Sequence, residues 1–495
     1  MSPSTWLPDA SHYPEQLTPL SATVWFEAVG TGLHEAMREL RGPFGGFEAR
    51  TELGWAYEGD LEMEWEAEPG ALERAATDLP RRWPQELRPE VRSITRRLHR
   101  LRPEQSDPPA AVAMLDRMWE LVLRQWTLHF MAVVPAQKAI ELFTDSMPAG
   151  ADPLAAYAQL EQGDESTVAD AMVRRLAERA RALRVADVLR EYPVEVIRER
   201  LAELRDGRRW LHELDRYLLR YGGRSRWHEL SLPREAEMPR MTLESIRLLV
   251  ERPVAVRITP IEPGPSDADG VLAVGRFGYA LKESHVYDID YPGLLATREV
   301  LLGFGRRLLA EGRLSRLDDV WMLRRPELRS ALASPGSVGI DAIARARRDE
   351  LAQGLVEGPR PFLGEPPVQA ERDAILEKFY GRGAGETHGS TLQGTGASAG
   401  HAEGPARLVR TAEDFPRVRP GDVMVAATTT PAWTPLFASL AGLITETGGI
   451  LSHAAIVARE YRLPAVLGVR GAMARIPDGA RVRLDGRTGQ VTLVR

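Results

Sequence analysis

The stretch TETGGILSHAAIVARE, residues 445–460, decides the fold of the C-terminal region. It follows an apolar run that predicts a buried strand, and it continues into small apolar residues that predict a helix. Gly448 and Gly449 permit backbone angles that side chains disfavour, so the chain can turn sharply between strand and helix. Ser452 is the expected N-cap, which places His453 in the first helical turn.

The expected position of His453 suits a nucleophile. Unpaired backbone N–H groups and the helix dipole at a helix start favour anionic groups. The same field disfavours a charged imidazolium and therefore keeps a ring nitrogen free to attack. These features fit a histidine that accepts a phosphoryl group, and they fit equally well a capping histidine beside an ordinary strand–helix turn.

Length and composition indicate a soluble protein of about two to four domains. Of the 495 residues, 43% are hydrophobic and 27% are charged, and the net charge of −6 indicates no nucleic-acid surface. The absence of cysteine excludes disulfides, thiol catalysis and Cys-ligated zinc. The N-terminus lacks a signal-peptide pattern, and charges interrupt the most apolar helical stretch. A cytoplasmic protein is therefore expected.

Residues 71–221 carry apolar side chains at helical spacing. The predicted helices are residues 92–101, 111–134, 168–183, 194–204 and 211–221. Trp119, Trp126 and Phe130 are expected in the core of this helical region, and His129 on the same helix is expected to be structural. A later helix is predicted over residues 294–311, after a turn-rich segment at residues 251–278.

The composition changes at residues 381–400, which are rich in Gly, Ser and Thr and typical of a flexible linker. Short strands and turns are predicted after it, at residues 406–410, 423–427, 443–445, 465–467, 482–484 and 491–494. The expected fold is therefore multidomain α+β. A mostly helical N-terminal domain (residues 1–380) precedes a Gly-rich linker (residues 381–391) and a C-terminal α/β domain (residues 392–495).

The segment TGGILSHAAIVAREYRLPAVLG, residues 447–468, resembles the phosphohistidine swivelling domain of the phosphoenolpyruvate (PEP)-utilising enzymes. PGDVMVA (residues 420–426), TTPAWTPLF (429–437) and DGRTGQVTLV (485–494) support the resemblance. Earlier segments resemble the acceptor domain of rifampicin phosphotransferase-like proteins. They are YPEQLTPLSATVW (13–25), YGGRSRWHELSLPR (221–234), LKESHVYDIDYPGLLATREVLLGFGRRL (281–308) and DDVWMLRRPEL (318–328).

The resemblance implies a phosphotransferase of the dikinase-like type, with a phosphohistidine intermediate on His453 and a small-molecule acceptor in the N-terminal domain. In the family an ATP-grasp domain precedes the acceptor domain. This sequence offers no room for one, no Walker-type motif, and only Lys138, Lys282 and Lys378 as lysines. We therefore expect ATP and Mg²⁺ to be bound by a separate ATP-grasp subunit, with AMP and phosphate as the other products.

The candidate site residues fall into two groups. The candidate catalytic residues are His453, Glu283, Lys282 and His285. The candidate phosphate- or substrate-binding residues are Thr447, Gly448, Gly449, Ser452, Arg459, Thr430, Thr434, Arg224 and Arg298. Lys282-Glu283 stands where similar phosphotransferases have Arg-Glu, and Val286 stands where they have a later lysine. Each arginine also fits a structural ion pair, and no metal site is predicted.

Two other functions remain compatible with the sequence. One is an ATP-dependent condensing enzyme of the ligase type, which differs only in the fate of a phosphorylated intermediate. The other is a non-catalytic binding homologue that kept the fold, although the intact TGG-x-x-SH motif argues against it.

Overall fold

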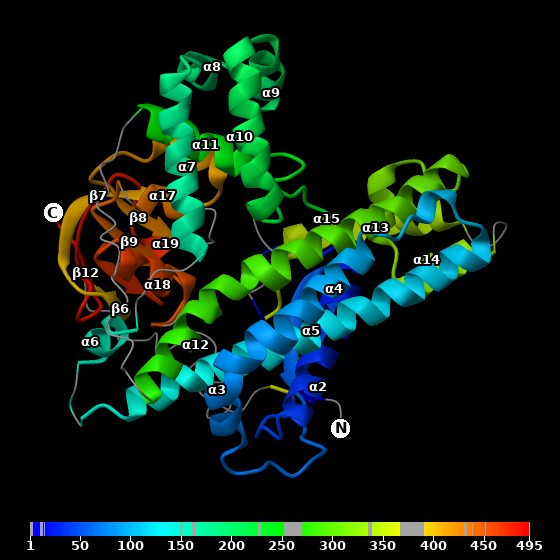
Figure 1. The fold of residues 1–495 in the computed structure, drawn as a ribbon, viewed down its shortest axis with the longest axis horizontal. Coiled ribbons are helices and arrows are strands. Elements are labelled where there is room, and N and C mark those ends of the chain that lie inside the picture. The colour runs from blue at the N-terminus through cyan, green and yellow to red at the C-terminus, as the bar shows by residue number, and fades with distance from the viewer. Residues whose placement is uncertain are drawn as a thin grey trace. The chain divides into compact units, whose positions relative to one another are not determined.

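The computed structural model describes residues 3–9, 13, 15–148, 150, 152–160, 165–225, 229–251, 270–334, 339–366, 391–429, 433–437, 439–450 and 452–494. The chain divides into two compact units, whose helices and strands are labelled in Figure 1. Unit 1 takes its described residues from Met1–Asp145, Trp227–Pro233 and Gly270–Pro367. Unit 2 takes them from Ser146–Arg226, Arg234–Asp269 and Val368–Arg495.

Unit 1 is mainly helical. Its helices are α1 (Pro19–Thr23), η1 (Val24–Gly30), α2 (Thr31–Glu39), α3 (Ala71–Arg82), η2 (Trp83–Leu87), α4 (Arg88–Leu98), η3 (Pro103–Gln105), α5 (Pro108–Asp145), α12 (Val271–His285), η4 (Val286–Asp290), α13 (Tyr291–Ala310), η5 (Leu317–Met322), α14 (Arg325–Ala333) and α15 (Ile340–Glu357). A small sheet in the order β2-β3-β1-β4 completes it, from β1 (Thr5–Pro8), β2 (Phe47–Glu52), β3 (Trp55–Asp60) and β4 (Leu363–Gly364).

Helix α5 is the centre of unit 1, and three other helices approach it at glycines. Gly32 of α2 has room for no side chain, because a Cβ there would lie 2.8 Å from Trp126 Cβ. Gly278 of α12 is equally close, since its Cβ would lie 2.8 Å from Ala139 Cβ. A Cβ on Gly293 of α13 would collide with the Gln125 amide. Close-packed interiors resist added volume, so these glycines set how near the helices can pack.

The start of the helical region is held by one buried carboxylate. Glu229 accepts hydrogen bonds from the Thr18 backbone N–H at 3.0 Å and the Thr18 hydroxyl at 2.8 Å. The Ser21 hydroxyl and the Ser231 backbone N–H also donate to it, the latter at 2.7 Å. Glu229 therefore accepts hydrogen bonds from donors at the beginning of α1 that lack partners within the helix, so its role is structural.

Unit 2 combines a group of helices with an α/β domain. The helices are α6 (Pro153–Ala158), α7 (Glu165–Ala182), α8 (Ala186–Glu191), α9 (Val194–Glu203), α10 (Arg205–Tyr221), α11 (Arg240–Glu251), η6 (Ala412–Arg417), α17 (Thr434–Phe437), α18 (His453–Glu460) and α19 (Ala472–Arg475). The strands are β5 (Thr391–Gln393), β6 (Thr395–Ser398), β7 (His401–Leu408), β8 (Val423–Ala426), β9 (Gly442–Thr445), β10 (Ala465–Leu467), β11 (Arg481–Asp485) and β12 (Gln490–Leu493).

These strands form one sheet in the order β5-β12-β11-β7-β8-β9-β10-β6. Strands β7, β8, β9 and β10 are parallel, and the flanking pairs are antiparallel. Alternate residues enter two separate cores, as the period of two in a strand requires. Met424 and Leu443 pack with α18 on one face, whereas Val425 and Ile444 belong to the core on the other.

The helices of unit 2 pack directly on the α/β domain. The Tyr461 hydroxyl, just after α18, donates to Asp170 of α7 at 2.5 Å, and the Arg174 guanidinium lies 5.3 Å from the centre of the Tyr461 ring. Met241 of α11 is buried in the same core as Val457 of α18. The predicted N-terminal helical region is therefore shared between the two units.

Most predicted elements exist, and two predictions were wrong. Residues 391–398, expected to continue the flexible Gly-rich stretch, form β5 and β6 because β5 pairs with β12 and β6 with β10. Helix α12 begins at Val271, inside the segment expected to be turn-rich, and runs through η4 into α13. Residues 381–390 of the predicted linker lie outside the described residues, so the division into 1–380, 381–391 and 392–495 stays a prediction.

None of the helices in the described part of the chain is both long enough and apolar enough to cross a membrane.

The glycine contact between α12 and α5 predicts a mutational effect. Gly278→Ala should lower the free energy of unfolding by about 1–3 kcal/mol, because the new methyl group must displace α12 from Ala139. Urea denaturation measures the change. Gly339→Ala is the control, since its Cβ would make only an ordinary 3.8 Å contact with Ala342. Equal effects of the two substitutions would contradict this account.

Candidate functional sites

The predicted nucleophile lies at the edge where the parallel strands end. Strands β8 and β9 end at Ala426 and Thr445. Hydrogen bonds connect the residues that follow the two strands. The Thr447 backbone N–H and hydroxyl both donate to the Ala427 carbonyl at 3.0 Å. Helix α18 then begins at His453, whose side chain lies outside what the structure describes. The carboxyl edge of a parallel sheet is the usual location of ligand sites in such folds.

The turn between β9 and α18 depends on one glycine. Gly448 has a φ of 107°, a conformation that residues with side chains seldom adopt. A Cβ there would also lie 3.0 Å from the Ser452 hydroxyl. The Gly449 carbonyl accepts the Ser452 backbone N–H at 3.0 Å, which closes the turn just before the helix.

Ser452 occupies the N-cap position, but its side chain makes no capping hydrogen bond. Its Oγ atom is buried and has no hydrogen-bond partner among the described residues. A buried hydroxyl without a partner is costly in a folded protein. Ser452 therefore offers a donor beside the start of α18.

Arg459 is buried and holds the loop from within the domain. Its Nη1 donates to the Ile450 carbonyl at 2.8 Å and to the Ala397 carbonyl at 3.0 Å. Its guanidinium also lies 5.3 Å from the centre of the Tyr157 ring. These contacts tie the loop that precedes His453 to strand β6. Thr430 and the Thr434 side chain lie outside the described residues.

The other predicted catalytic residues lie together at the end of α12 in unit 1. The Lys282 ammonium donates to the side-chain carbonyl of Gln137 on α5. Burial lowers the pKa of Lys282, and the nearby carboxylates of Glu283 and Glu141 offset only part of that effect. Glu283 is buried beside it, with 7% of its surface exposed.

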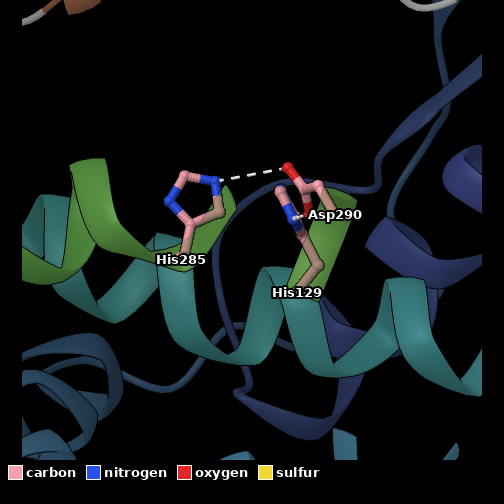
Figure 2. A group of neighbouring side chains, drawn as sticks. All are labelled: His129, His285 and Asp290. Atoms are coloured by element: carbon pink, nitrogen blue, oxygen red, sulfur yellow. Dashed lines mark hydrogen bonds and ion pairs between the residues drawn. The ribbon is translucent and has the colours of Figure 1, made fainter. Parts of the chain in front are cut away.

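His285 is part of a buried cluster that sequence reasoning missed. Its Nε2 lies 3.6 Å from Asp290 Oδ2, and His129 Nδ1 lies 2.7 Å from Asp290 Oδ1. Figure 2 shows the three side chains pointing toward one another from α5 and the segment that joins α12 to α13. Burial lowers the pKa of His285, which favours its neutral form. The sequence predicts a structural role for His129 and does not single out Asp290.

The two remaining predicted arginines fall in different units. Arg298 is buried in unit 1, donates to the Leu230 carbonyl at 2.6 Å and lies 5.5 Å from the centre of the Trp321 ring. Arg224 is buried in unit 2 and donates to the Tyr217 hydroxyl, while its carbonyl accepts the Glu235 backbone N–H at 2.8 Å. The end of α12 in unit 1 therefore brings together Lys282, Glu283 and His285. Arg224 belongs to unit 2.

Two protein-family models match parts of this chain. Residues 418–489 match the PEP-utilising enzyme mobile domain. Residues 128–260 match the fourth domain of rifampicin phosphotransferase. The predicted resemblance is confirmed. The region with α18 at its centre is thus similar to the PEP-utilising mobile domain, and the end of α5 together with α6 to α11 is similar to the rifampicin phosphotransferase domain.

Three curated relatives extend this picture. Chondramide synthase cmdD of Chondromyces crocatus is 29% identical over 99% of this chain and 14% of its own length. The uncharacterised phosphotransferase YvkC of Bacillus subtilis is 32% identical over 61% of this chain and 38% of its own. The rifampicin phosphotransferase of Streptomyces sviceus is 29% identical over 63% of this chain and 39% of its own. The chain thus spans well under half the length of each.

The opposite environments of two lysines predict a difference in their titration. Lys282 should titrate below the ordinary lysine range because of its burial. Lys138 should titrate above it, because its hydrogen bond to Glu73 raises the lysine pKa. Competitive acetylation at a series of pH values, followed by peptide mass spectrometry, gives both midpoints. A Lys282 midpoint at or above that of Lys138 would refute the assignment.

Proposed function

We propose that this chain is a phosphotransferase component that carries a phosphoryl group on His453 to a small-molecule acceptor bound near the end of α12. The match of residues 418–489 to the PEP-utilising mobile domain is the observation that carries the proposal. His453 stands at the start of α18, where backbone N–H groups stabilise negative charge on a phosphoryl group. The buried Ser452 hydroxyl supplies a further donor.

The donor half of the reaction uses ATP and Mg²⁺ bound by a separate ATP-grasp subunit. ATP and water are consumed, and AMP, inorganic phosphate and phosphohistidine are formed. The bond from the β-phosphorus to the AMP oxygen breaks while a phosphorus–nitrogen bond to His453 forms. Water cleaves the bond between the β- and γ-phosphoryl groups, and the γ-phosphoryl group leaves as inorganic phosphate. Splitting the transfer in this way replaces one difficult displacement by two easier ones.

The acceptor half takes place at Lys282, Glu283 and His285. The phosphorus–nitrogen bond breaks, a phosphorus–oxygen bond to the acceptor hydroxyl forms, and Glu283 or His285 takes the hydroxyl proton. Lys282 offsets negative charge on the phosphoryl oxygens, which is the main task of a protein in such transfers. Lysine supplies the same positive charge as arginine but cannot bind two phosphoryl oxygens in a bidentate arrangement. Burial strengthens these interactions, because water does not screen them.

Labelling of His453 tests the donor half. The chain, a candidate ATP-grasp subunit and β-³²P-labelled ATP should give an acid-labile, base-stable label on the chain. His453→Ala should abolish it, because no phosphorus–nitrogen bond can form. His401→Ala is the matched control, since His401 is an exposed histidine of the same domain. Equal labelling of the His453 and His401 variants would refute the proposal.

Substitution of Lys282 tests the acceptor half separately. Lys282→Met should leave labelling of His453 intact and slow its discharge to acceptor at least about 10-fold, because a hydrogen-bonded charge near the transferred group is removed. Lys138→Met provides the control, because Lys138 pairs with Glu73 of α3 and not with Gln137. Discharge at the wild-type rate in Lys282→Met would place the acceptor elsewhere.

A condensing reaction is a second candidate. Chondramide synthase cmdD, a synthase by name, is similar over nearly the whole of this chain. In that case a phosphorylated carboxylate would be attacked by a second substrate and would release phosphate. Product analysis of the discharge reaction separates the two, because transfer to a hydroxyl leaves a phosphorylated compound and no free phosphate from this step.

A further inference from the structure

The buried cluster of His129, His285 and Asp290 is the strongest feature that the proposed function leaves unexplained. One member comes from the middle of α5 and the other two from the junction of α12 and α13 (Figure 2). All three are buried, with at most 9% of each residue exposed. Burying three polar groups together costs free energy unless their polar atoms are satisfied.

The backbone at this junction is wound so that two of the residues face the same way. In an α-helix, residues five apart point about 140° away from each other. Residues Val286–Asp290 instead form η4, a π-helical segment with i→i+5 hydrogen bonds. That winding brings Asp290 onto the same face as His285. Single π-helical turns inside longer helices are frequent at functional sites.

A hydrogen bond and a glycine hold α5 against this segment. Gln125, one turn before His129, donates from Nε2 to the Ile289 carbonyl at 2.9 Å. Gly293 leaves the space that the Gln125 amide fills. The relative positions of His129 and Asp290 are therefore set by the backbones of both helices, which is what a preorganised ligand set requires.

The contacts of His285 leave one ring nitrogen facing a carboxylate. Its Nδ1 lies 3.3 Å from the Leu281 carbonyl, an oxygen that can only accept. This contact favours the tautomer with the proton on Nδ1 and a lone pair on Nε2. That lone pair faces Asp290 Oδ2 at 3.6 Å, a separation too long for a hydrogen bond. A cation placed between the Nε2 lone pair of His285 and the Asp290 carboxylate would be attracted to both.

We propose that His129, His285 and Asp290 form a binding site for one divalent transition-metal ion of the zinc and iron(II) class. Two imidazoles and one carboxylate are a ligand set that such ions prefer. Ligands about 2.1 Å from a common ion lie about 3.0–3.4 Å apart at tetrahedral or octahedral angles. His285 Nε2 lies 3.6 Å from Asp290 Oδ2, close to that range, whereas His129 Nδ1 is hydrogen-bonded to Asp290 Oδ1 at 2.7 Å. Metal binding replaces that hydrogen bond and releases the Nδ1 proton, as metal binding to imidazole generally does. All the ligand atoms lie within 4.8 Å of one another, so small side-chain rotations complete the site.

The surroundings suit such an ion. Rings of Trp126 and Phe130 pack against His129, with centroids 4.9 Å and 4.8 Å away. These apolar walls limit access of water and strengthen the attraction between ion and carboxylate. The bond from His285 Nδ1 to a backbone carbonyl is the outer contact that commonly orients a metal-binding imidazole. Because the protein supplies only three ligands, a fourth coordination position of the ion is open to an oxygen atom of water or of another molecule.

This inference is independent of the phosphotransferase proposal, although the two meet at His285. A histidine whose lone pair binds an ion cannot also accept a proton from an acceptor hydroxyl. With the ion bound, Glu283 is therefore the base. Metal binding is measured without ATP, partner or acceptor, so its failure would leave the test of His453 unaffected.

Metal content of the tag-free chain tests the site. The chain is stripped with a chelator, incubated with Zn²⁺ alone, desalted and assayed by mass spectrometry of the metal. We expect about one ion per chain, and at least about 10-fold weaker binding in Asp290→Asn, which keeps the side-chain shape but loses the charge. His99→Asn is the control, because His99 is an exposed histidine of the same unit and pairs with Glu299.

Cobalt gives a second readout that does not rely on a variant folding well. Co²⁺ bound to the wild-type chain should develop visible absorption bands typical of mixed nitrogen and oxygen ligands, and Zn²⁺ should displace them. The bands should be absent in His129→Asn and His285→Asn and present in His99→Asn. If the wild-type chain retains no ion, or if the ion and bands persist equally in the His129, His285 and Asp290 variants, the site does not exist.

Discussion

The close approach of three helices to α5 is the constraint on which unit 1 depends. Gly32, Gly278 and Gly293 allow backbones to meet where any side chain would collide. Apolar burial supplies the driving force, but it does not select one register, because many pairings bury similar areas. Glycine contacts do select one, since another register would place a side chain where only the hydrogen of glycine fits. The facing positions of α5 and the α12–α13 segment are thereby fixed, and those positions carry His129 and Asp290.

A different constraint governs unit 2. Strand β9 must turn into α18 within a few residues, and Gly448 makes the turn possible through its positive φ. Helix α18 is then buried over most of its length by Ala454, Ala455 and Val457, so it has little freedom to shift. Its start is held at the sheet edge by this packing and by the Arg459 hydrogen bonds to the loop that precedes it.

Much of this organisation could be predicted from the sequence, because it follows from local patterns. The strands around residues 423–426 and 442–445 are apolar runs, and α5 and α10 show clear helical spacing. The predictions failed where local composition favours a loop but residues distant in the sequence stabilise a strand or helix. Residues 391–398 are rich in small polar residues, yet they form β5 and β6 because partner strands supply their hydrogen bonds. The start of α12 at Val271 was missed because the segment before it is dense in turn-forming residues.

The two candidate sites differ in the same way. The residues around His453 are neighbours in sequence, so a motif describes them, whereas His129 and Asp290 are 161 positions apart and meet only through packing. A sequence-only signal did exist for half of the cluster, since a histidine and an aspartate five apart share a face only in a π-helical turn. Helical periodicity assumes 3.6 residues per turn and discards that pair. Local winding therefore decides whether these side chains can meet: with His285 and Asp290 on opposite faces of an α-helix, the two could not bind one ion together.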